Sequence, residues 1–146
     1  MDAHPHASYV ARLEAAVDRF GRYMTSAASR HLAEVPGPML SGSQRVVLRA
    51  LVDNGPQQVT EVANHLNVTL SAATGLVDRL VKAKLVTRDR DQKDRRVVWV
   101  KVTPEGEQAV KAAEQRRRAV LGQLVHHLSE TDLYTLCSIL ERIDYP

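Results

Sequence analysis

Residues 60–102 decide the fold of this 146-residue chain; they read TEVANHLNVTLSAATGLVDRLVKAKLVTRDRDQKDRRVVWVKV. Their first part holds two helical patterns of apolar residues, interrupted at Asn67–Thr69. Thr60 and Thr69 are the expected caps of these two helices, because a threonine hydroxyl accepts a hydrogen bond from an amide of the first turn. The second helix is expected to run from about Leu70 to Lys84 and to bury Leu70, Ala73, Leu76, Val77 and Leu80. Two short helices in this arrangement predict a helix-turn-helix.

The second part of the same stretch changes to strand-forming residues. Leu85–Arg88 and Val97–Val102 are rich in such residues, and the polar turn Asp91–Arg95 lies between them. The pattern predicts a two-stranded hairpin with a charged tip, which must pack against the helices because an isolated hairpin is marginally stable. Helices followed by a basic hairpin predict a winged helix-turn-helix, so the expected fold class is mainly α with a small β-hairpin wing.

Further helices are predicted on both sides of this head. Ser41 and Gln44 form a capping-box pattern, Thr103–Pro104 is a typical helix start, and Ser129 is the expected cap of a last helix. Apolar residues repeat at spacings of three and four along the first and last helices: Leu13, Val17, Phe20, Met24 and Ala27, then Leu133, Leu136, Leu140 and Ile143. A small head cannot cover this surface, so we expect a symmetric homodimer through the first and the last two helices.

Composition and charge narrow the class of protein. The chain is 44% hydrophobic and 25% charged, with a net charge of +3, which is an ordinary globular mix. The stretch Arg79–Lys101 alone carries +6 and the remainder −3. This basic segment suits a polyanion, with a solvated charged face as the alternative. Cys137 is the single cysteine, so no intramolecular disulfide is possible and a reducing, cytoplasmic compartment is expected.

The sequence shows neither a membrane-span pattern nor a secretion-signal pattern. No apolar run approaches the about 18–20 residues of a membrane span. The first ten residues, MDAHPHASYV, lack both the basic start and the apolar stretch of a signal peptide. The sequence therefore predicts neither a membrane protein nor a secreted one.

Four motifs, in this order and spacing, resemble the MarR family of transcriptional regulators. They are SGSQRVVLRAL at 41–51, TEVANHLNVTLSAATGLVDRLVKAKLVTR at 60–88, Asp94-Arg95-Arg96, and VTPEG at 102–106. The resemblance covers nearly the whole chain and implies one MarR-like domain over 1–146. Within it, the DNA-binding head spans 41–103 and dimerisation helices span 7–35 and 104–145. Gly75 departs from the family, which often has a larger basic residue there, and Lys84 replaces a common glycine.

Helix-turn-helix geometry and the resemblance together assign the expected DNA-binding residues. The first half of the second helix reaches base edges in the major groove. The Asp94 carboxylate is expected to hold the Arg96 guanidinium extended, and the resemblance implies that this arginine enters the minor groove. The full expected set is Thr69, Ser71, Ala72, Thr74, Gly75, Arg79, Arg88, Arg90, Lys93, Asp94, Arg95 and Arg96. Capping or solvated hydroxyls, and a plain surface ion pair at the wing, are the structural alternatives.

The resemblance implies a sequence-specific, double-stranded DNA-binding transcriptional regulator. The family default is a homodimeric repressor on a palindromic operator, released by a small aromatic or phenolic ligand. Alternatives are a metal- or redox-responsive regulator of the same fold, using His31, His65 or Cys137, and a winged-helix protein-interaction module. We expect ordinary interface or surface histidines and a buried Cys137. With six aromatic residues, a single-strand or RNA binder is disfavoured. No catalytic residues, metal or cofactor are expected.

Overall fold

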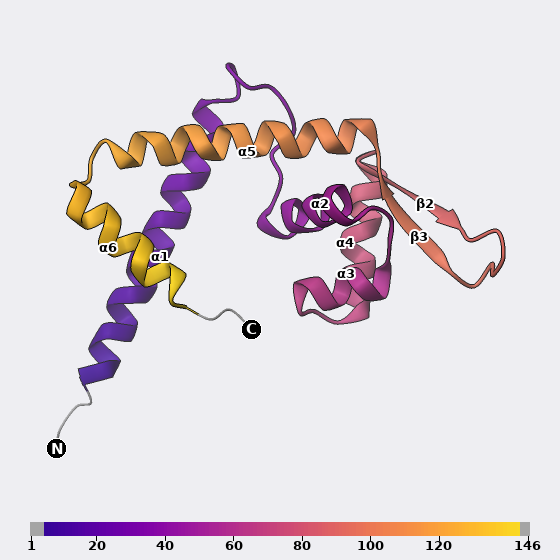
Figure 1. The fold of residues 1–146 in the computed structure, drawn as a ribbon, viewed down its shortest axis with the longest axis horizontal. Coiled ribbons are helices and arrows are strands. Elements are labelled where there is room, and N and C mark those ends of the chain that lie inside the picture. The colour runs from indigo at the N-terminus through magenta and orange to yellow at the C-terminus, as the bar shows by residue number, and fades with distance from the viewer. Residues whose placement is uncertain (1–4, 144–146) are drawn as a thin grey trace. The chain divides into compact units, whose positions relative to one another are not determined.

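The computed structural model describes the backbone of residues 5–143 and the side chains of residues 7–143, which form six helices and three short strands (Figure 1). In chain order these are α1 (Pro5–Arg30), α2 (Gly42–Asn54), β1 (Gln57–Gln58), α3 (Val59–Leu66), α4 (Leu70–Lys82), β2 (Val86–Arg90), β3 (Val98–Val102), α5 (Pro104–Val125) and α6 (Glu130–Glu141). Positions 144 and 145, which the sequence places in the last dimerisation segment, lie outside the described residues.

The chain divides into two compact units. One comprises the described parts of Met1–Glu34 and Arg116–Pro146, and the other is Val35–Gln115. We call the second unit the head. The head contains α2, α3, α4, the three strands and the first half of α5. In Figure 1 the β2–β3 hairpin extends away from the three head helices, as expected for a wing.

The apolar faces of the head helices and strands form one hydrophobic core. Its buried members are Val47, Leu48, Leu51, Val62, Ala63, Ala73, Leu76, Val77, Leu80, Leu85, Val86, Val100, Ala109 and Val110. The predicted burial on α4 is therefore confirmed at four positions. It is wrong at Leu70, which is 53% exposed. Leu70 is the first residue of α4, and side chains on a helix tilt toward its N-terminus, so this side chain lies beyond the end of the core.

The wing belongs to a three-stranded antiparallel sheet in the order β1-β3-β2. β2 pairs with β3 from Val86↔Val102 to Arg90↔Val98, so the first strand begins one residue later and ends two residues later than predicted. β1 pairs Gln57 with Val100 on the other side of β3. Sequence patterning missed β1, because two glutamines show no apolar alternation.

Most predicted helix starts are confirmed by side-chain hydrogen bonds. The Gln44 amide donates to Ser41 Oγ at 3.2 Å, and the Ser41 amide donates to Gln44 Oε1 at 2.9 Å, which completes the capping box. The Ala72 amide donates to Thr69 Oγ1 at 3.2 Å. Further along the chain, Thr103 Oγ1 accepts from the Gly106 amide at 3.0 Å and Ser129 Oγ from the Asp132 amide at 3.1 Å.

The predicted cap at Thr60 is wrong. Helix α3 begins at Val59 with Gln58 as its cap residue, and the Glu61 carboxylate accepts from the Gln58 amide at 2.6 Å. The cause is tertiary, because β1 holds Gln57–Gln58 against β3 and the chain must turn into the helix directly afterwards. The helix therefore starts before the threonine that local propensity favours.

Helix α4 ends at Lys82, two residues earlier than predicted, and the chain reverses through Lys84. Lys84 has φ 61°, in the left-handed region, and the Leu85 amide donates to the Leu80 carbonyl at 3.0 Å. Helices commonly end in this way with a glycine, since a Cβ is disfavoured there. Lys84 therefore keeps the helix ending that a glycine commonly makes, but it occupies a strained conformation.

In the unit outside the head, α1 and α6 each carry many exposed apolar side chains. Exposed large apolar residues include Tyr9, Val10, Leu13, Val17 and Phe20 on α1, and Tyr134, Leu136, Ile139 and Leu140 on α6. Cys137 is also exposed, so the prediction that it is buried is wrong for the single chain. Within the described residues, no helix combines the length and apolar character needed to cross a membrane.

Candidate nucleic-acid interface

The N-terminal half of α4 presents small side chains to solvent. Thr69 caps the helix, Ser71 and Ala72 are exposed, and Gly75 is half-buried. The Thr74 hydroxyl donates to the Leu70 carbonyl at 2.8 Å, so its proton is already used and the oxygen is left as an acceptor. We call α4 the recognition helix from here on, because it is the second helix of the helix-turn-helix.

Gly75 is not required by packing. A Cβ built on this residue would meet only the Arg79 side chain, with Nη1 at 3.7 Å, which is ordinary contact. Glycine at this position therefore relieves no clash. It leaves the recognition helix without a projecting side chain at position 75.

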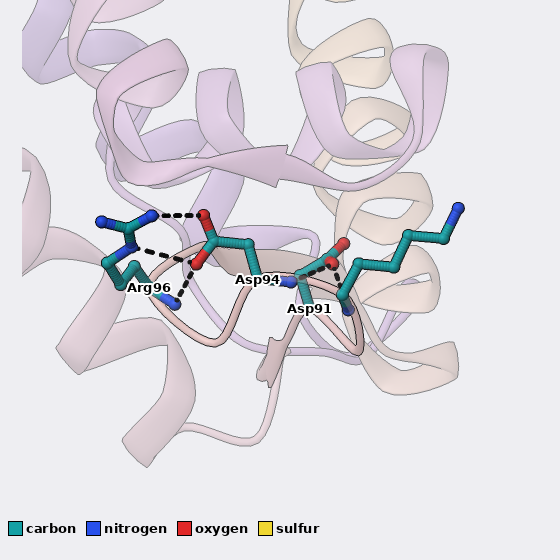
Figure 2. Close-up of polar contacts among 4 residues, drawn as sticks. Asp91, Asp94 and Arg96 are labelled. Carbon is teal, nitrogen blue, oxygen red and sulfur yellow. Dashed lines mark hydrogen bonds and ion pairs between the residues drawn. The ribbon is translucent and has the colours of Figure 1, made fainter.

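The tip of the wing carries a preformed ion pair between Asp94 and Arg96 (Figure 2). Arg96 Nε donates to Asp94 Oδ1 at 3.2 Å, Nη2 donates to Oδ2 at 3.3 Å, and the Arg96 amide donates to Oδ1 at 3.0 Å. These hydrogen bonds, from the side chain first and then the backbone, lower the pKa of Asp94. The Arg96 side chain is nevertheless 91% exposed, so its guanidinium is oriented and still free to contact another molecule.

A second carboxylate, Asp91, organises the turn and was not among the predicted site residues. Its Oδ1 accepts from the Lys93 and Asp94 amides at 2.8 and 3.0 Å, and Figure 2 shows it beside Asp94. Its Oδ2 accepts from the Trp99 indole Nε1 at 3.0 Å. The Trp99 bond, followed by the two amides, lowers the pKa of Asp91. An aspartate at the start of a turn is a known local signal, whereas its bond to Trp99 depends on the strand register.

Arg88 connects the wing to the recognition helix. Its Nη1 lies 2.5 Å from Asp78 Oδ1, and its Nη2 donates to the Thr74 carbonyl at 3.5 Å. We call these contacts of Arg88 with α4 the helix–wing clasp. Arg88 is predicted from the sequence to lie beside phosphates, and that role stays a prediction; the structure adds Asp78 as an intramolecular partner.

The other predicted cations lie on the surface of the same unit. The exposed side chains are Arg79, Arg90, Lys93 and Arg95. Lys101 pairs with Asp89 across the two wing strands, with Nζ 2.8 Å from Oδ2. Every predicted DNA-contact residue therefore belongs to the head, on the recognition helix or the wing.

The residues considered for sensing form no metal cluster among the side chains that the structure describes. His31 lies near the end of α1, and its Nδ1 is 2.8 Å from Glu34 Oε2. His65 is exposed on α3. The absence of a sensing role for these two histidines stays a prediction.

The head has the architecture of a winged helix-turn-helix DNA-binding protein, with a recognition helix followed by a basic wing. Residues 40–98 match the MarR family. The HTH-type transcriptional regulator YfiV of Bacillus subtilis is 30% identical over 124 residues, which is 83% of this chain and 78% of YfiV. The chain belongs to the MarR family of transcriptional regulators, and it is not an enzyme.

Other relatives and solved structures are consistent with this family assignment. The regulator YpoP of Bacillus subtilis is 29% identical over 76% of this chain and 79% of its own, and the repressor MdtR of the same organism is 30% identical over 69% and 65%. The structure of Bacillus subtilis YusO has a TM-score of 0.70 at 24% identity, over 97% of this chain and 96% of that one. A MepR-like protein complexed with pseudoligands has a TM-score of 0.64 at 26% identity, over 92% of each chain.

Proposed function

We propose that this MarR-family regulator is a homodimeric repressor that binds a palindromic operator and is released by a small aromatic or phenolic ligand. The observation that carries the DNA-binding part is the Asp94–Arg96 ion pair at the tip of the wing. It orients a highly exposed arginine on the most basic segment of the chain. Such a side chain fits the narrow minor groove, whose negative potential attracts arginine.

The recognition helix supplies the contacts in the major groove. Its first turns carry Thr69, Ser71, Ala72, Thr74 and Gly75, which are small enough for the backbone to approach the bases. Hydroxyls bind bases or phosphates, and an alanine methyl contacts thymine. The exposed cations Arg79, Arg90, Lys93 and Arg95 serve as phosphate contacts. Arg88 is the least suited to this role, since Asp78 already pairs with its guanidinium.

The DNA-binding proposal is tested by titrating labelled duplex DNA with the protein and following fluorescence anisotropy. Replacing Arg96 by alanine should weaken operator binding by about 5- to 150-fold, the range of one good arginine contact. The matched control is Arg117→Ala, which removes an exposed arginine outside the head and should leave affinity unchanged. With about six phosphates neutralised per dimer, log K should fall against log salt with a slope near −5. Equal affinities for wild type and Arg96→Ala contradict the wing assignment.

The homodimer is supported by the exposed apolar side chains of α1 and α6. Leu13 and Val17 are 66% and 60% exposed in the single chain, one helical turn apart. A contiguous apolar surface of this kind is typical of a protein interface. Sedimentation at micromolar concentration should show a dimer for the wild type and a folded monomer for Val17→Asp. A monomeric wild type would contradict this part of the proposal.

Repression and ligand release are supported by relatives. MdtR is a repressor, and the MepR-like structure is a complex with pseudoligands. A ligand releases DNA only if it binds the DNA-free conformation more tightly, and the coupling must be reciprocal. A panel of phenols and aromatic carboxylates should contain compounds that lower the affinity of the protein for duplex DNA. Saturating duplex should then lower the affinity of the protein for those compounds by the same factor. We place this regulator in the cytoplasm, with the DNA it binds.

A redox-responsive regulator is the second candidate, and one observation favours it. Cys137 is exposed on α6, a helix that also carries exposed apolar residues. Oxidation of an exposed thiolate can change an interface. Peroxide should then release duplex from the wild type but not from Cys137→Ser. Equal binding before and after peroxide treatment removes this candidate.

A further inference from the structure

The beginning of the recognition helix carries apolar side chains that core packing does not explain. Leu70 is 53% exposed, and Val68, just before the cap residue, is 43% exposed. Neither is among the residues that form the hydrophobic core of the head or pack against it. Ala72, two positions further along, is also exposed. The surface that should approach DNA is therefore apolar at its leading end.

The position of Leu70 in the helix determines what its side chain can reach. Leu70 is the first residue of α4, directly after the capping Thr69. Because Cβ atoms tilt toward the N-terminus of a helix, the Leu70 side chain extends past the helix end. In a helix-turn-helix, this end of the recognition helix enters the major groove and contacts base edges. Leu70 thus occupies a base-contacting position and has no polar atom with which to make a hydrogen bond.

The chemistry of base edges selects the partner of such a side chain. In the major groove, thymine displays a C5-methyl group beside its O4 acceptor, while guanine, adenine and cytosine display hydrogen-bonding groups and no methyl group. An apolar side chain over those polar groups displaces their water without replacing the hydrogen bonds, which is unfavourable. The +6 charge of Arg79–Lys101 attracts the phosphate backbone and brings the two surfaces together.

We propose that Leu70 contacts a thymine C5-methyl group in each operator half-site and is a specificity-determining residue of this regulator. Val68 and Ala72 flank it and extend the apolar contact. This inference rests on the proposed DNA-binding function. It assigns a thymine requirement to the half-site position that faces the first turn of α4.

The test uses a duplex enriched from a random pool by the wild-type protein. Each thymine and its symmetry mate are replaced in turn by deoxyuridine, which differs only in lacking the methyl group. Wild type should lose about fourfold affinity per half-site at one thymine position, the ratio expected for burial of one methyl group. Leu70→Ala should bind the thymine duplex more weakly and should bind thymine and deoxyuridine duplexes equally at that position.

The control variant is Val46→Ala, which shortens a 44% exposed residue on α2 and should keep the full thymine preference. Circular dichroism should show unchanged folding for both variants, since neither residue is buried. A thymine preference that persists in Leu70→Ala, or one that is absent at every position in wild type, overturns the inference and leaves DNA binding intact. A pool that yields no enriched duplex overturns the proposed function as well.

Discussion

Replacing Gly106 with alanine is expected to weaken the junction between the wing and α5. A Cβ on Gly106 would lie 2.1 Å from the Leu85 carbonyl oxygen and 2.8 Å from Val102 Cγ2, and contacts under 3.0 Å essentially never occur. The start of α5 must therefore move by about 0.9 Å, and the carbonyl that it meets is backbone, which cannot rotate away as a side chain does.

The magnitude follows from the contacts that this movement breaks. The Thr103 amide donates to the Leu85 carbonyl at 3.0 Å, and the Thr103 hydroxyl donates to the Lys84 carbonyl at 2.8 Å. Each such bond contributes about 1 kcal/mol net. Overpacking typically costs about 1–3 kcal/mol. Since the movement relieves part of the clash, we expect Gly106→Ala to lower the free energy of unfolding by about 2–4 kcal/mol.

Urea denaturation, followed by circular dichroism at fixed protein concentration, measures this change. The matched control is Gly122→Ala in the same helix, where an added Cβ meets nothing within 4 Å. That variant should be unchanged or stabilised by up to about 1 kcal/mol, because alanine favours a helix interior over glycine. The reasoning is refuted if Gly106→Ala is as stable as the wild type, or if both variants change by the same amount.

Three further predictions concern the head. Lys84→Gly should raise the free energy of unfolding by about 0.5–1 kcal/mol in urea denaturation, because φ 61° is unfavourable for a lysine; a less stable variant contradicts this. Asp78→Ala and Arg88→Ala should each lower the free energy of unfolding by about 0.2–1 kcal/mol, and the double variant by less than their sum, in a double-mutant cycle; additive losses would mean that the Arg88–Asp78 pair contributes nothing. Hydrogen bonds lower the pKa of Asp91, so its stabilisation of the turn is complete above the ordinary value of 3.8 and is lost as pH falls through the lower folded value. The Trp99 indole proton, followed by NMR, should titrate with a midpoint below 3.8, and a midpoint at or above it refutes the assignment.

The parts of the fold that depend on residues close together in the sequence were predictable. Ser41, Thr69, Thr103 and Ser129 all cap helices as expected, because a cap bonds to amides only two or three residues away. Thr60 fails for the opposite reason, since pairing of β1 with β3 fixes the start of α3 and the sequence contains no local sign of that pairing.

In the wing, too, the contact between residues close in sequence was predictable and the contact between distant residues was not. Asp94 and Arg96 are two residues apart, and the sequence predicted their ion pair from that spacing. Asp91 bonds to Trp99 eight positions away, which requires a hairpin register that composition cannot supply. Leu70 was expected in the core because it continues the apolar spacing of α4. The periodicity is real, but the core extends along α4 only as far as Ala73, and Leu70 at the helix start lies outside it.

The helix–wing clasp joins the recognition helix directly to the wing. Arg88 bonds to Asp78 and to the Thr74 carbonyl, and both elements pack in one hydrophobic core, so the helix proposed for the major groove and the strand leading to the proposed minor-groove arginine keep a fixed separation. Each added base pair shifts the DNA by about 3.4 Å and also rotates it. A half-site with one base pair inserted between its two contacted segments would therefore be out of phase with the protein. If the head binds DNA as proposed, this fixed separation makes spacing within the half-site part of what the head would recognise.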